Sequence, residues 1–571
     1  MPTDQQRDAI FAEDLEYILR ASPGSGKTWT SCRRFIWRAA NWDYKAGGLA
    51  LLSFTNTAIS EFYQATVGVG RRDLLSNPNY VGTFDSFIER FVISPFGHLP
   101  SGSPERPKLF LAPRPGDWEN ANLQCWTTMK DGSKRPIPAW EIIPFPDNGK
   151  VAYKASSSYG GKTLTFNQIN PVAQLLKLGF YTHQQRAYLA FKILLNRPHI
   201  AHCLARRFPE IIVDEAQDTN VWLIIILNFL REKGMKVSLV GDPDQCIYEF
   251  GMADATSLPA LKEKWRIREM PLSRSFRCNT AIAQAVRHIS GNIGFDGCGD
   301  SLNEFCLPII VRCGDARNSD CITSFEAHLE RAGILQDNSA VLCRAHEQLE
   351  AIRGVVSYTA LQGLTKDMAL AAFHRDVRKD YKKSFQIVRS TIRKMIDEPS
   401  FWDELDDNPE SETSVRFKLA LWKFAKTKDN LPGLEENAID WITKLKANLG
   451  KLFPELGISN IPSLGHKLKT TGLDKSQLAQ PLFQPDSLFP PIRQETIHQV
   501  KGESIDAVLL LGSTKFFNSL ISAIEGGQNS EERRLAYVAM TRARHVLMVG
   551  LPAVHFDKHA SKWTSWGFTT T

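Results

Sequence analysis

The stretch Ala-Ser-Pro-Gly-Ser-Gly-Lys-Thr at residues 21–28 decides the fold of this chain. It follows the β-type run Tyr17–Ala21 and precedes a helix-forming segment. Glycines at such a turn let backbone N–H groups approach a phosphate, and the start of the following helix favours negative charge. Lys27 adds a cation, and Thr28 adds a hydroxyl that can ligate Mg²⁺. The stretch predicts a phosphate-binding loop, although Ala21 stands where the pattern has its first glycine; a glycine-rich turn is the alternative.

A second stretch, Glu-Ile-Ile-Val-Asp-Glu-Ala-Gln-Asp at residues 210–218, is an apolar run that ends in paired carboxylates. Ligands of open parallel sheets bind at the carboxyl ends of the strands, so this run predicts Asp214 and Glu215 beside the phosphate-binding loop. Asp214 is a candidate partner of Mg²⁺, and Glu215 can orient and deprotonate an attacking water. A solvent-exposed strand end is the alternative for either residue alone, and the nearby loop makes that alternative weak.

Short β-type runs that alternate with helix-forming segments predict an α/β fold with two parallel sheets flanked by helices. The first series of runs comprises 17–21, 49–54, 80–84, 210–213, 237–240 and 268–272, and the second comprises 307–312, 340–343, 495–499, 507–511 and 546–550. We therefore expect one domain at residues 1–265 and a second at 266–571.

Each expected domain carries an insertion of different character. Residues 94–170 are rich in Pro, Gly and Ser, which predicts an irregular insertion in the first domain. Residues 356–490 of the second domain contain apolar residues at three- and four-residue steps, as in Glu436–Gly450, which predicts a mainly helical insertion.

Composition excludes several protein classes. With 571 residues, 43% of them hydrophobic and 23% charged, the chain has the ordinary globular mixture, and its net charge of +7 permits a polyanionic partner without requiring one. The ten cysteines form no Cys-x-x-Cys pair, which favours reduced cytosolic thiols. Residues 1–12 lack a secretory pattern, and the longest apolar run, Val221–Leu230, is too short to span a bilayer. We expect a cytoplasmic protein without a membrane partner and a buried helix at that run.

The motifs then follow the order seen in superfamily 1 helicases, and the chain resembles the UvrD/Rep/PcrA type. The segments that carry the resemblance are DQQRDAI (4–10), ASPGSGKT (21–28), LLSFTNTAISEF (51–62), VGTFDSF (81–87), IIVDEAQD (211–218), LVGDPDQCIYEF (239–250), LSRSFRC (272–278), TIHQVKGESIDAV (496–508) and EERRLAYVAMTRAR (531–544). The resemblance implies two RecA-like P-loop motor domains, each with an inserted subdomain, and ATP hydrolysis with Mg²⁺ in the cleft between them.

Carried over by motif, the resemblance implies roles for individual residues at the nucleotide. Gln245 would sense the γ-phosphate, and Arg277 and Arg542 would reach it from the second domain, where a positioned arginine accelerates phosphoryl transfer by roughly 10³- to 10⁵-fold. The nucleotide-binding set would be Gln6, Ser22, Gly24, Ser25, Gly26, Lys27, Thr28, Phe276, Arg277, Glu503 and Arg542, with Thr28 and Asp214 at the metal. Gln6 and Phe276 would contact adenine.

The resemblance also implies a path for single-stranded DNA. Aromatic, small polar and basic side chains suit sequence-tolerant binding, because every base offers a π-face for stacking. The implied residues are Phe54, Thr55, Asn56, Thr83, Phe84, Tyr248, Phe250, His498 and Lys501. The chain departs from the family where Asp85 replaces a frequent His, where Ser275 replaces a frequent Asn, and where Glu503 stands one position before the usual acidic residue, with Ser504 in its place.

Three functions remain under consideration. The first is an ATP- and Mg²⁺-dependent DNA translocase and helicase with 3′ to 5′ polarity. The second is a DNA-sensing ATPase that regulates a partner nuclease, such as the OLD-type nuclease of Gabija-like anti-phage systems; the compact insertion and short tail favour it. The third is a catalytically silent scaffold, against which the intact Lys27, Asp214 and Glu215 argue.

Overall fold

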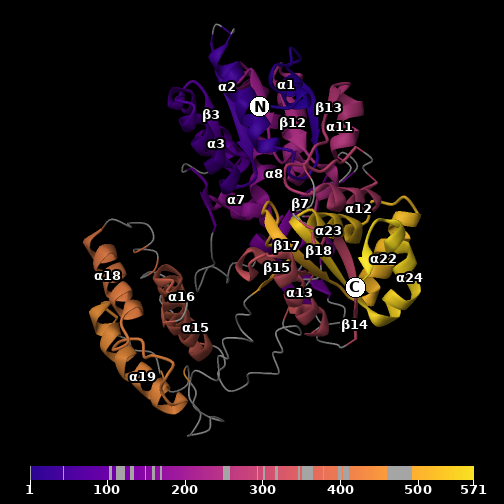
Figure 1. The fold of residues 1–571 in the computed structure, drawn as a ribbon. Helices are drawn as coiled ribbons and strands as arrows, with labels where there is room; N and C mark the ends of the chain where they lie inside the picture. The colour runs from indigo at the N-terminus through magenta and orange to yellow at the C-terminus, as the bar shows by residue number, and fades with distance from the viewer. Residues whose placement is uncertain are drawn as a thin grey trace. The chain divides into compact units, whose positions relative to one another are not determined.

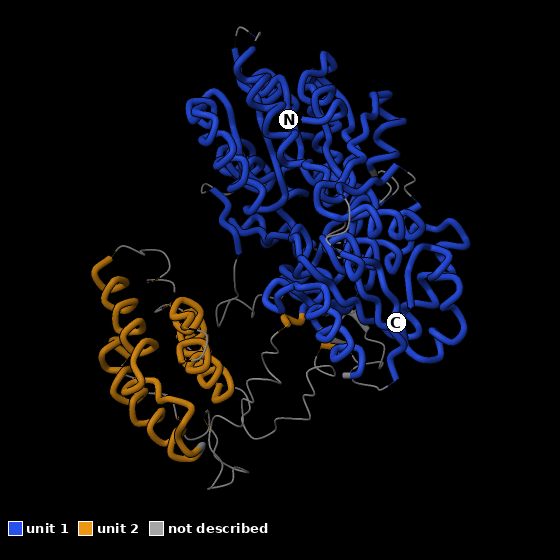
Figure 2. The backbone as a smooth tube through the Cα atoms, viewed as in Figure 1, with its two compact units in different colours: residues 1–344, 495–571 blue, residues 345–494 orange. Residues whose placement is uncertain are grey.

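The computed structural model describes residues 2–42, 44, 46–101, 106–110, 123–128, 134–147, 150–156, 161–166, 170–247, 257–291, 294–299, 303–314, 319–344, 348–349, 364–376, 379–396, 402, 405, 411–458, 464, 468 and 492–570. The chain divides into two compact units (Figure 2). Unit 1 comprises residues 1–344 and 495–571, and unit 2 comprises residues 345–494. Both candidate motor sheets lie in unit 1.

The first sheet of unit 1 has six parallel strands in the order β13-β1-β12-β11-β2-β3. Its strands β3, β12 and β13 are labelled in Figure 1. Side chains alternate between the two faces of each strand. Ile18 and Leu52 belong to one buried cluster, whereas Leu19 and Leu51 belong to another, so both faces of the sheet are covered. The strands are β1 (Tyr17–Ala21), β2 (Leu49–Ser53), β3 (Tyr80–Thr83), β11 (Glu210–Val213), β12 (Lys236–Gly241) and β13 (Arg268–Leu272).

The strand β13 lies just after the domain boundary expected at residues 265/266, which stays a prediction. All five of its residues pair in parallel register with β1, from Tyr17 opposite Arg268 to Ala21 opposite Leu272. The backbone N–H of Ser22 also donates to the Leu272 carbonyl (2.9 Å). The first sheet therefore extends to residue 272, as expected from the run 268–272 in the first series of β-type runs.

Helices flank the first sheet, and the starts of α3 and α10 are fixed by side-chain caps. The helix α3 starts where Thr55 caps it by accepting from the Ala58 N–H, and α10 starts in the same way at Asn220. The buried helix expected at Val221–Leu230 is confirmed as part of α10. The helices are α1 (Asp4–Ile10), α2 (Lys27–Ala40), α3 (Asn56–Gly68), α4 (Phe84–Ile88), α8 (His183–Asn196), α9 (Pro198–Arg207), α10 (Val221–Glu232) and α11 (Ser257–Trp265).

The insertion in the first half is more regular than its composition predicts. The strands β5 (Gln124–Thr128) and β6 (Lys134–Pro138) form an antiparallel pair, and β7 (Ile142–Asp147), β8 (Lys150–Ala155) and β9 (Thr163–Leu164) form an antiparallel sheet. The expectation of an irregular segment is wrong for these residues. Prolines are tolerated there because β7 is an edge strand, where an absent N–H costs no ladder bond.

The remaining elements of this insertion are short. The strands β4 (Lys108–Leu109) and β10 (Phe180–Tyr181) pair in parallel, and the helix α7 (Pro171–Lys177) precedes β10. Asn170 caps α7 by accepting from the N–H groups of Val172 and Ala173.

The second sheet of unit 1 also has six strands, in the order β16-β15-β17-β18-β14-β19. Its strands are β14 (Pro308–Cys313), β15 (Ser339–Cys343), β16 (Arg493–Thr496), β17 (Ile505–Leu511), β18 (Ala543–Pro552) and β19 (Thr569–Thr570). The flanking helices are α12 (Thr280–Ser290), α13 (Ser319–Ala332), α22 (Thr514–Glu525), α23 (Glu531–Met540) and α24 (Ala553–Ser565). The α/β class with two parallel sheets flanked by helices is thus confirmed.

The second sheet contains one departure from the expectation of reduced thiols. Cys313 at the end of β14 and Cys321 in the first turns of α13 form a disulfide, with their Cα atoms 5.6 Å apart. The spacing of eight residues is long enough for the chain to turn from the strand into the helix and bring both side chains together. Sequence spacing alone does not reveal that turn.

Unit 2 is helical in its described part, as the periodicity predicts. It contains α15 (Leu364–Asp376), α16 (Tyr381–Met395), α18 (Glu412–Lys426) and α19 (Ala438–Glu455), which share their own buried cluster around Trp441. Among the residues that the structure describes in either unit, no helix has the length and apolarity that a membrane crossing requires.

Candidate functional site

The phosphate loop lies between β1 and α2, as the sequence predicts. Gly24 and Gly26 have positive φ angles of 72° and 80°, which glycine adopts at no steric cost. The buried Ser25 hydroxyl has no hydrogen-bond partner among the described residues. Gln6 donates to the Ser25 carbonyl (3.0 Å) and accepts from the Thr3 N–H (3.0 Å), so both of its amide atoms hold the loop and the start of α1. The role of Gln6 at adenine stays a prediction.

Asp214, at the end of β11, contacts the first turns of α2. Its carboxylate accepts from the Thr28 hydroxyl (3.1 Å) and the Ser31 hydroxyl (3.4 Å), and the residue is fully buried. Burial and the neighbouring charge of Glu215 raise the pKa of Asp214. Carboxylate and hydroxyl oxygens are ligands that Mg²⁺ accepts, so the donor set at Thr28 and Asp214 fits that ion.

Glu215 is held in a strained conformation that aims its carboxylate at Lys27. Its φ of 53° is left-handed, which is uncommon for a residue other than glycine and recurs at functional sites. The Glu215 carboxylate lies 3.2 Å from the Lys27 ammonium and accepts from the Gln217 amide (2.5 Å). Burial alone would raise the pKa of Glu215, but Lys27 and Lys501 outweigh that effect and lower it. Glu215 is therefore an ionised carboxylate suited to accept a proton or orient water.

Two arginines outside the first sheet face these groups: Arg277 between β13 and α12, and Arg542 between α23 and β18. Arg542 is fully buried, and its guanidinium donates to the Gln245 side chain (3.0 Å) and to the carbonyls of Val538 (2.9 Å) and Glu503 (3.3 Å). Burial and the nearby Arg277 lower the pKa of Arg542. Gln245 in turn donates to Asp242 (2.7 Å). The Gln245 side chain thus links Arg542, which precedes β18 of the second sheet, to Asp242, which follows β12 of the first sheet.

Arg277 is the second of these cations. Its guanidinium donates to the Ser504 hydroxyl (2.7 Å) and to the carbonyls of Thr541 (3.2 Å) and Gly502 (3.3 Å). Among the described residues, neither Arg277 nor Arg542 has a carboxylate within ion-pair distance, although the charge of Glu215 acts on both. Two cations that are paired only with neutral acceptors make this side of the site electropositive.

The phosphate loop touches the second lobe directly. A β-carbon added at Gly24 would lie 2.5 Å from the Arg277 Cβ, so only glycine fits at that contact. The Phe276 N–H donates to the Gly24 carbonyl (2.8 Å), and the Phe276 ring is 48% exposed. An exposed ring beside the loop agrees with the stacking role expected for Phe276, which stays a prediction. Ser22, also in the loop, is buried and has partners of its own.

The expected DNA path requires Lys501 to lie on an open surface, but its side chain is largely buried. Its ammonium donates to both carboxylate oxygens of Asp218 at 2.6 and 2.7 Å, and the two side chains are 10% and 9% exposed. Asp218 belongs to the turn after β11, whereas Lys501 follows β16, so this buried ion pair joins the two lobes of unit 1. The family resemblance placed Lys501 on the DNA together with His498, whose ring contacts the Ile247 carbonyl (3.3 Å).

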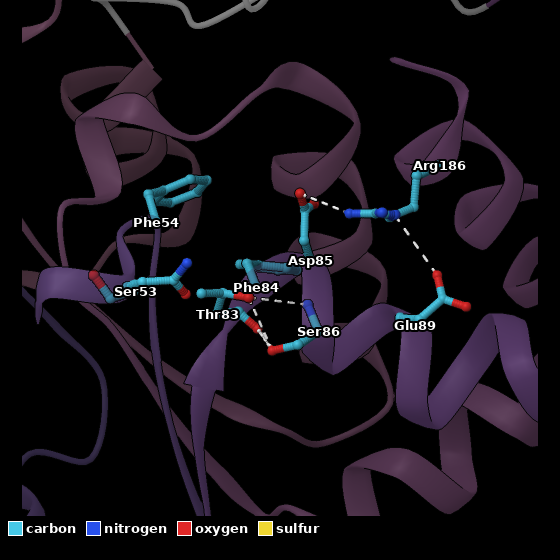
Figure 3. A pocket seen from close by; sticks show the side chains of 9 residues that line it. Ser53, Phe54, Thr83, Phe84, Asp85, Ser86, Glu89 and Arg186 are labelled. Carbon is cyan, nitrogen blue, oxygen red and sulfur yellow. Dashed lines mark hydrogen bonds and ion pairs between the residues drawn. The ribbon is translucent and has the colours of Figure 1, made fainter. Parts of the chain in front are cut away.

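The other predicted DNA residues lie mainly around a pocket at the carboxyl ends of β2 and β3 (Figure 3). The pocket has a volume of about 420 Å³ and is lined by Ser53, Phe54, Asn56, Thr83, Phe84, Asp85, Ser86, Glu89 and Arg186. The rings of Phe54 and Phe84 stack with centroids 6.2 Å apart, but Phe84 is only 1% exposed and packs into the core. Phe84 therefore supports Phe54 rather than offering an open face. Tyr248 and Phe250 lie outside the described residues.

Two predicted polar residues serve as local helix caps. Thr55 and Thr83 cap α3 and α4, and Asn56 is exposed beside the pocket. Glu503 is exposed, and its carbonyl accepts from Arg542, while Ser504 accepts from Arg277. The ribose contact expected at Glu503 stays a prediction.

Sequence reasoning missed several residues that shape the site. Gln217 orients Glu215 and accepts from the Asp242 N–H (3.0 Å), and Ser31 contacts Asp214. The position of Ser31 one turn beyond Thr28 on α2 is a signal that helical spacing could have revealed. The partner of Asp85, Arg186, is distant in sequence, and no local signal predicts their contact.

The comparisons with known proteins agree with this geometry. The UvrD/REP helicase N-terminal domain matches residues 2–110 and 162–266, and the UvrD-like helicase C-terminal domain matches residues 359–552. The chain belongs to the UvrD/Rep/PcrA-type helicases. Its two parallel sheets correspond to the two RecA-like motor domains of the UvrD-like family.

Two of the individual relatives cover most of this chain, and a third covers half of it. DNA helicase II of Escherichia coli is 24% identical over 95% of this chain and 83% of its own length. ATP-dependent DNA helicase Rep of Buchnera aphidicola is 22% identical over 95% of this chain and 92% of its own, and ATP-dependent DNA helicase PcrA of Bacillus subtilis is 23% identical over 50% and 39%. A solved arterivirus helicase, nonstructural protein 10, covers 96% of this chain and 61% of its own at 10% identity with a TM-score of 0.30, too weak to bear on the fold.

Proposed function

We propose that this chain is an ATP- and Mg²⁺-dependent DNA translocase and helicase that moves 3′ to 5′ along single-stranded DNA. The observation that carries the proposal is positive charge on both sides of one gap in unit 1. Lys27 and the Ser25 hydroxyl, which has no hydrogen-bond partner among the described residues, lie on one side, and the guanidinium groups of Arg277 and Arg542, which have no carboxylate partner there, lie on the other. A triphosphate supplies the negative charge that this arrangement lacks.

Different residues carry out different parts of ATP hydrolysis. The Gly24 and Gly26 backbone and Lys27 bind the phosphates, and Thr28 with Asp214 would hold Mg²⁺, which neutralises charge on the phosphate oxygens. Glu215, kept ionised by Lys27 and Lys501, orients the attacking water and accepts its proton.

Charge grows on the γ-phosphoryl oxygens in the transition state, where arginine N–H groups stabilise it. Arg277 and Arg542 from the second lobe meet this demand, and Gln245 links Arg542 to the first lobe. Hydrolysis therefore depends on the separation of the lobes, which converts nucleotide turnover into movement along a strand. Stacking costs roughly 1.4 kcal/mol per base-pair step, a modest load for one step of an ATP-driven motor.

The test compares the wild-type protein with Lys27→Ala, using Lys177→Ala as a control because Lys177 is an exposed lysine on α7. Lys27→Ala is expected to abolish DNA-stimulated ATP hydrolysis and strand separation while the circular dichroism spectrum stays unchanged. Retained turnover would refute the assigned site.

Polarity is read from duplexes with a single-stranded tail on one side. Separation of the 3′-tailed duplex alone supports the proposal, and separation of the 5′-tailed duplex alone contradicts the polarity. DNA-stimulated hydrolysis without separation of either duplex would instead favour the alternative, an ATPase that senses DNA and regulates a partner nuclease.

A further inference from the structure

The pocket at the ends of β2 and β3 contains a buried arginine that the family motifs do not predict. Arg186 comes from α8, and its side chain is only 11% exposed. Figure 3 shows its guanidinium between Asp85 and Glu89 at the wall of the pocket. Its Nε atom has no hydrogen-bond partner among the described residues. A cation at this depth requires an anion, and the identity of that anion determines what the pocket can bind.

The two acidic neighbours of Arg186 differ in how firmly they are held. Glu89 lies 3.6 Å from the Arg186 Nε and is fixed from its other side, because the Tyr181 hydroxyl donates to it at 2.6 Å and the Ser94 hydroxyl at 3.3 Å. Glu89 is thus a permanent part of the wall. Its distance from Nε is that of an ion pair, and is too long for a hydrogen bond.

Asp85 is the displaceable neighbour. It lies 2.9 Å from one terminal nitrogen of Arg186, but its side chain is 57% exposed, and Arg186 is its one ion-pair partner among the described residues. Asp85 therefore occupies the solvent side of the guanidinium, where an entering anion would also bind. An exposed carboxylate of this kind holds its partner weakly, by roughly 0.2–1 kcal/mol.

The pocket also has the features that a nucleotide phosphate needs. The first turn of α3 begins at Asn56 on the pocket wall, which adds favourable potential for an anion. The partly exposed ring of Phe54 offers a surface for the adjoining base. The volume of about 420 Å³ lies within the range of roughly 300–1,000 Å³ that small-ligand pockets have.

We propose that Arg186 is a phosphate ligand of the DNA strand and that Asp85 is a built-in competitor which the phosphate displaces. This proposal rests on the proposed function, because it takes single-stranded DNA as the ligand of the pocket. Strand binding at this point is an exchange of one anion for another on Arg186. The exchange weakens binding relative to a site with a free arginine, so that the strand can leave the pocket as the motor advances.

The test is the Asp85→Asn variant, measured by fluorescence anisotropy with a labelled oligothymidine in the absence of nucleotide and over a series of salt concentrations. Removing the competitor should tighten binding about 1.4- to 5-fold at low salt, as expected for one partly exposed ion pair worth roughly 0.2–1 kcal/mol. The slope of log K against log salt should stay the same, because the strand makes the same phosphate contact with Arg186 in both proteins. Unchanged or weaker binding would overturn the proposal, because Asp85 would then be neutral or itself a ligand of the bases.

The matched control is Asp557→Asn. Asp557 is 59% exposed and lies 2.9 Å from Arg312, so its exposure and pairing match those of Asp85, but its arginine is exposed and lies on β14. An equal gain in oligothymidine affinity in Asp557→Asn would show that the gain comes from net charge alone, and it would overturn the proposal. Arg186→Leu should weaken binding and flatten the salt slope by about 0.7.

Asp85→Asn decides the question even where Arg186→Leu fails to fold, because Asp85 is exposed. Failure of the two proposals is distinguishable. A wild-type protein without DNA-stimulated hydrolysis contradicts the proposed function, whereas a hydrolysing wild type with an unaltered Asp85→Asn contradicts only the exchange at Arg186.

Discussion

The buried pair of Lys501 and Asp218 allows a stability prediction with a defined magnitude. The Lys501→Met change keeps the length of the side chain and removes its charge, which leaves the Asp218 carboxylate buried without its cation. Breaking a buried pair from one side costs about 3–5 kcal/mol. Unit 1 has roughly 420 residues, and an unfolding entropy of about 2.1 cal/mol/K per residue gives ~0.9 kcal/mol per degree. The expected fall in Tm is therefore about 3–6 °C.

The assay is thermal unfolding followed by circular dichroism, with the double variant Lys501→Met/Asp218→Asn beside the single one. Replacing both partners removes the unpaired charge, so the double variant should recover most of the lost stability. Burial raises the pKa of Asp218, and Lys501 is the first group that opposes this. Without Lys501, the folded state binds a proton more readily than the unfolded state, so the deficit of the single variant should shrink as pH falls. A wild-type Tm in Lys501→Met, or a double variant no more stable than the single one, would refute the reasoning.

Two further predictions concern Arg277 and His555. Arg277→Ala should lower single-turnover ATP hydrolysis by roughly 10³-fold or more while the affinity for a fluorescent ATP analogue changes far less, with Arg312→Ala as the control; equal losses of binding and hydrolysis would contradict a transition-state role. His555 is buried between the Asn518 side chain (2.8 Å) and the Trp563 indole N–H (3.3 Å), and its pKa is lowered from 6.5 to about 4, chiefly by burial. A protonated His555 would present a second N–H to that indole donor, so Tm should fall as pH drops from 6.5 to about 4. In His555→Phe this part of the pH dependence should be absent, and an unchanged profile would rule out His555 as its origin.

The sequence predicts the motor core well because its signals are local. Most of the parallel strands are apolar runs, and the phosphate loop and the Asp214 turn directly follow two of them, so pattern and chemistry coincide in neighbouring residues. The α/β class, the buried α10 and the helical insertion follow from such runs and periodicities. The domain limit at 265/266 stays a prediction. Strand order in a sheet is not encoded in the strand itself, since β13 pairs with β1, some 250 residues earlier.

The remaining differences arise from contacts between distant residues. The environment of Lys501 depends on Asp218, which is 283 positions away, and a motif match does not reveal whether a lysine faces solvent or an acid. The strands β5 to β9 are obscured by the prolines and glycines around them, since edge strands tolerate residues that central strands exclude. The disulfide of Cys313 depends on the turn between β14 and α13.

The path of the chain after β13 has a mechanical consequence. At residue 272 the backbone leaves the first sheet, and four residues later the Phe276 N–H is bonded to the Gly24 carbonyl. The crossover between the lobes thus runs alongside the phosphate loop instead of through a remote linker. Any rotation of one lobe against the other must act on that hydrogen bond. Release of spent nucleotide and advance along the strand are therefore parts of one coupled motion.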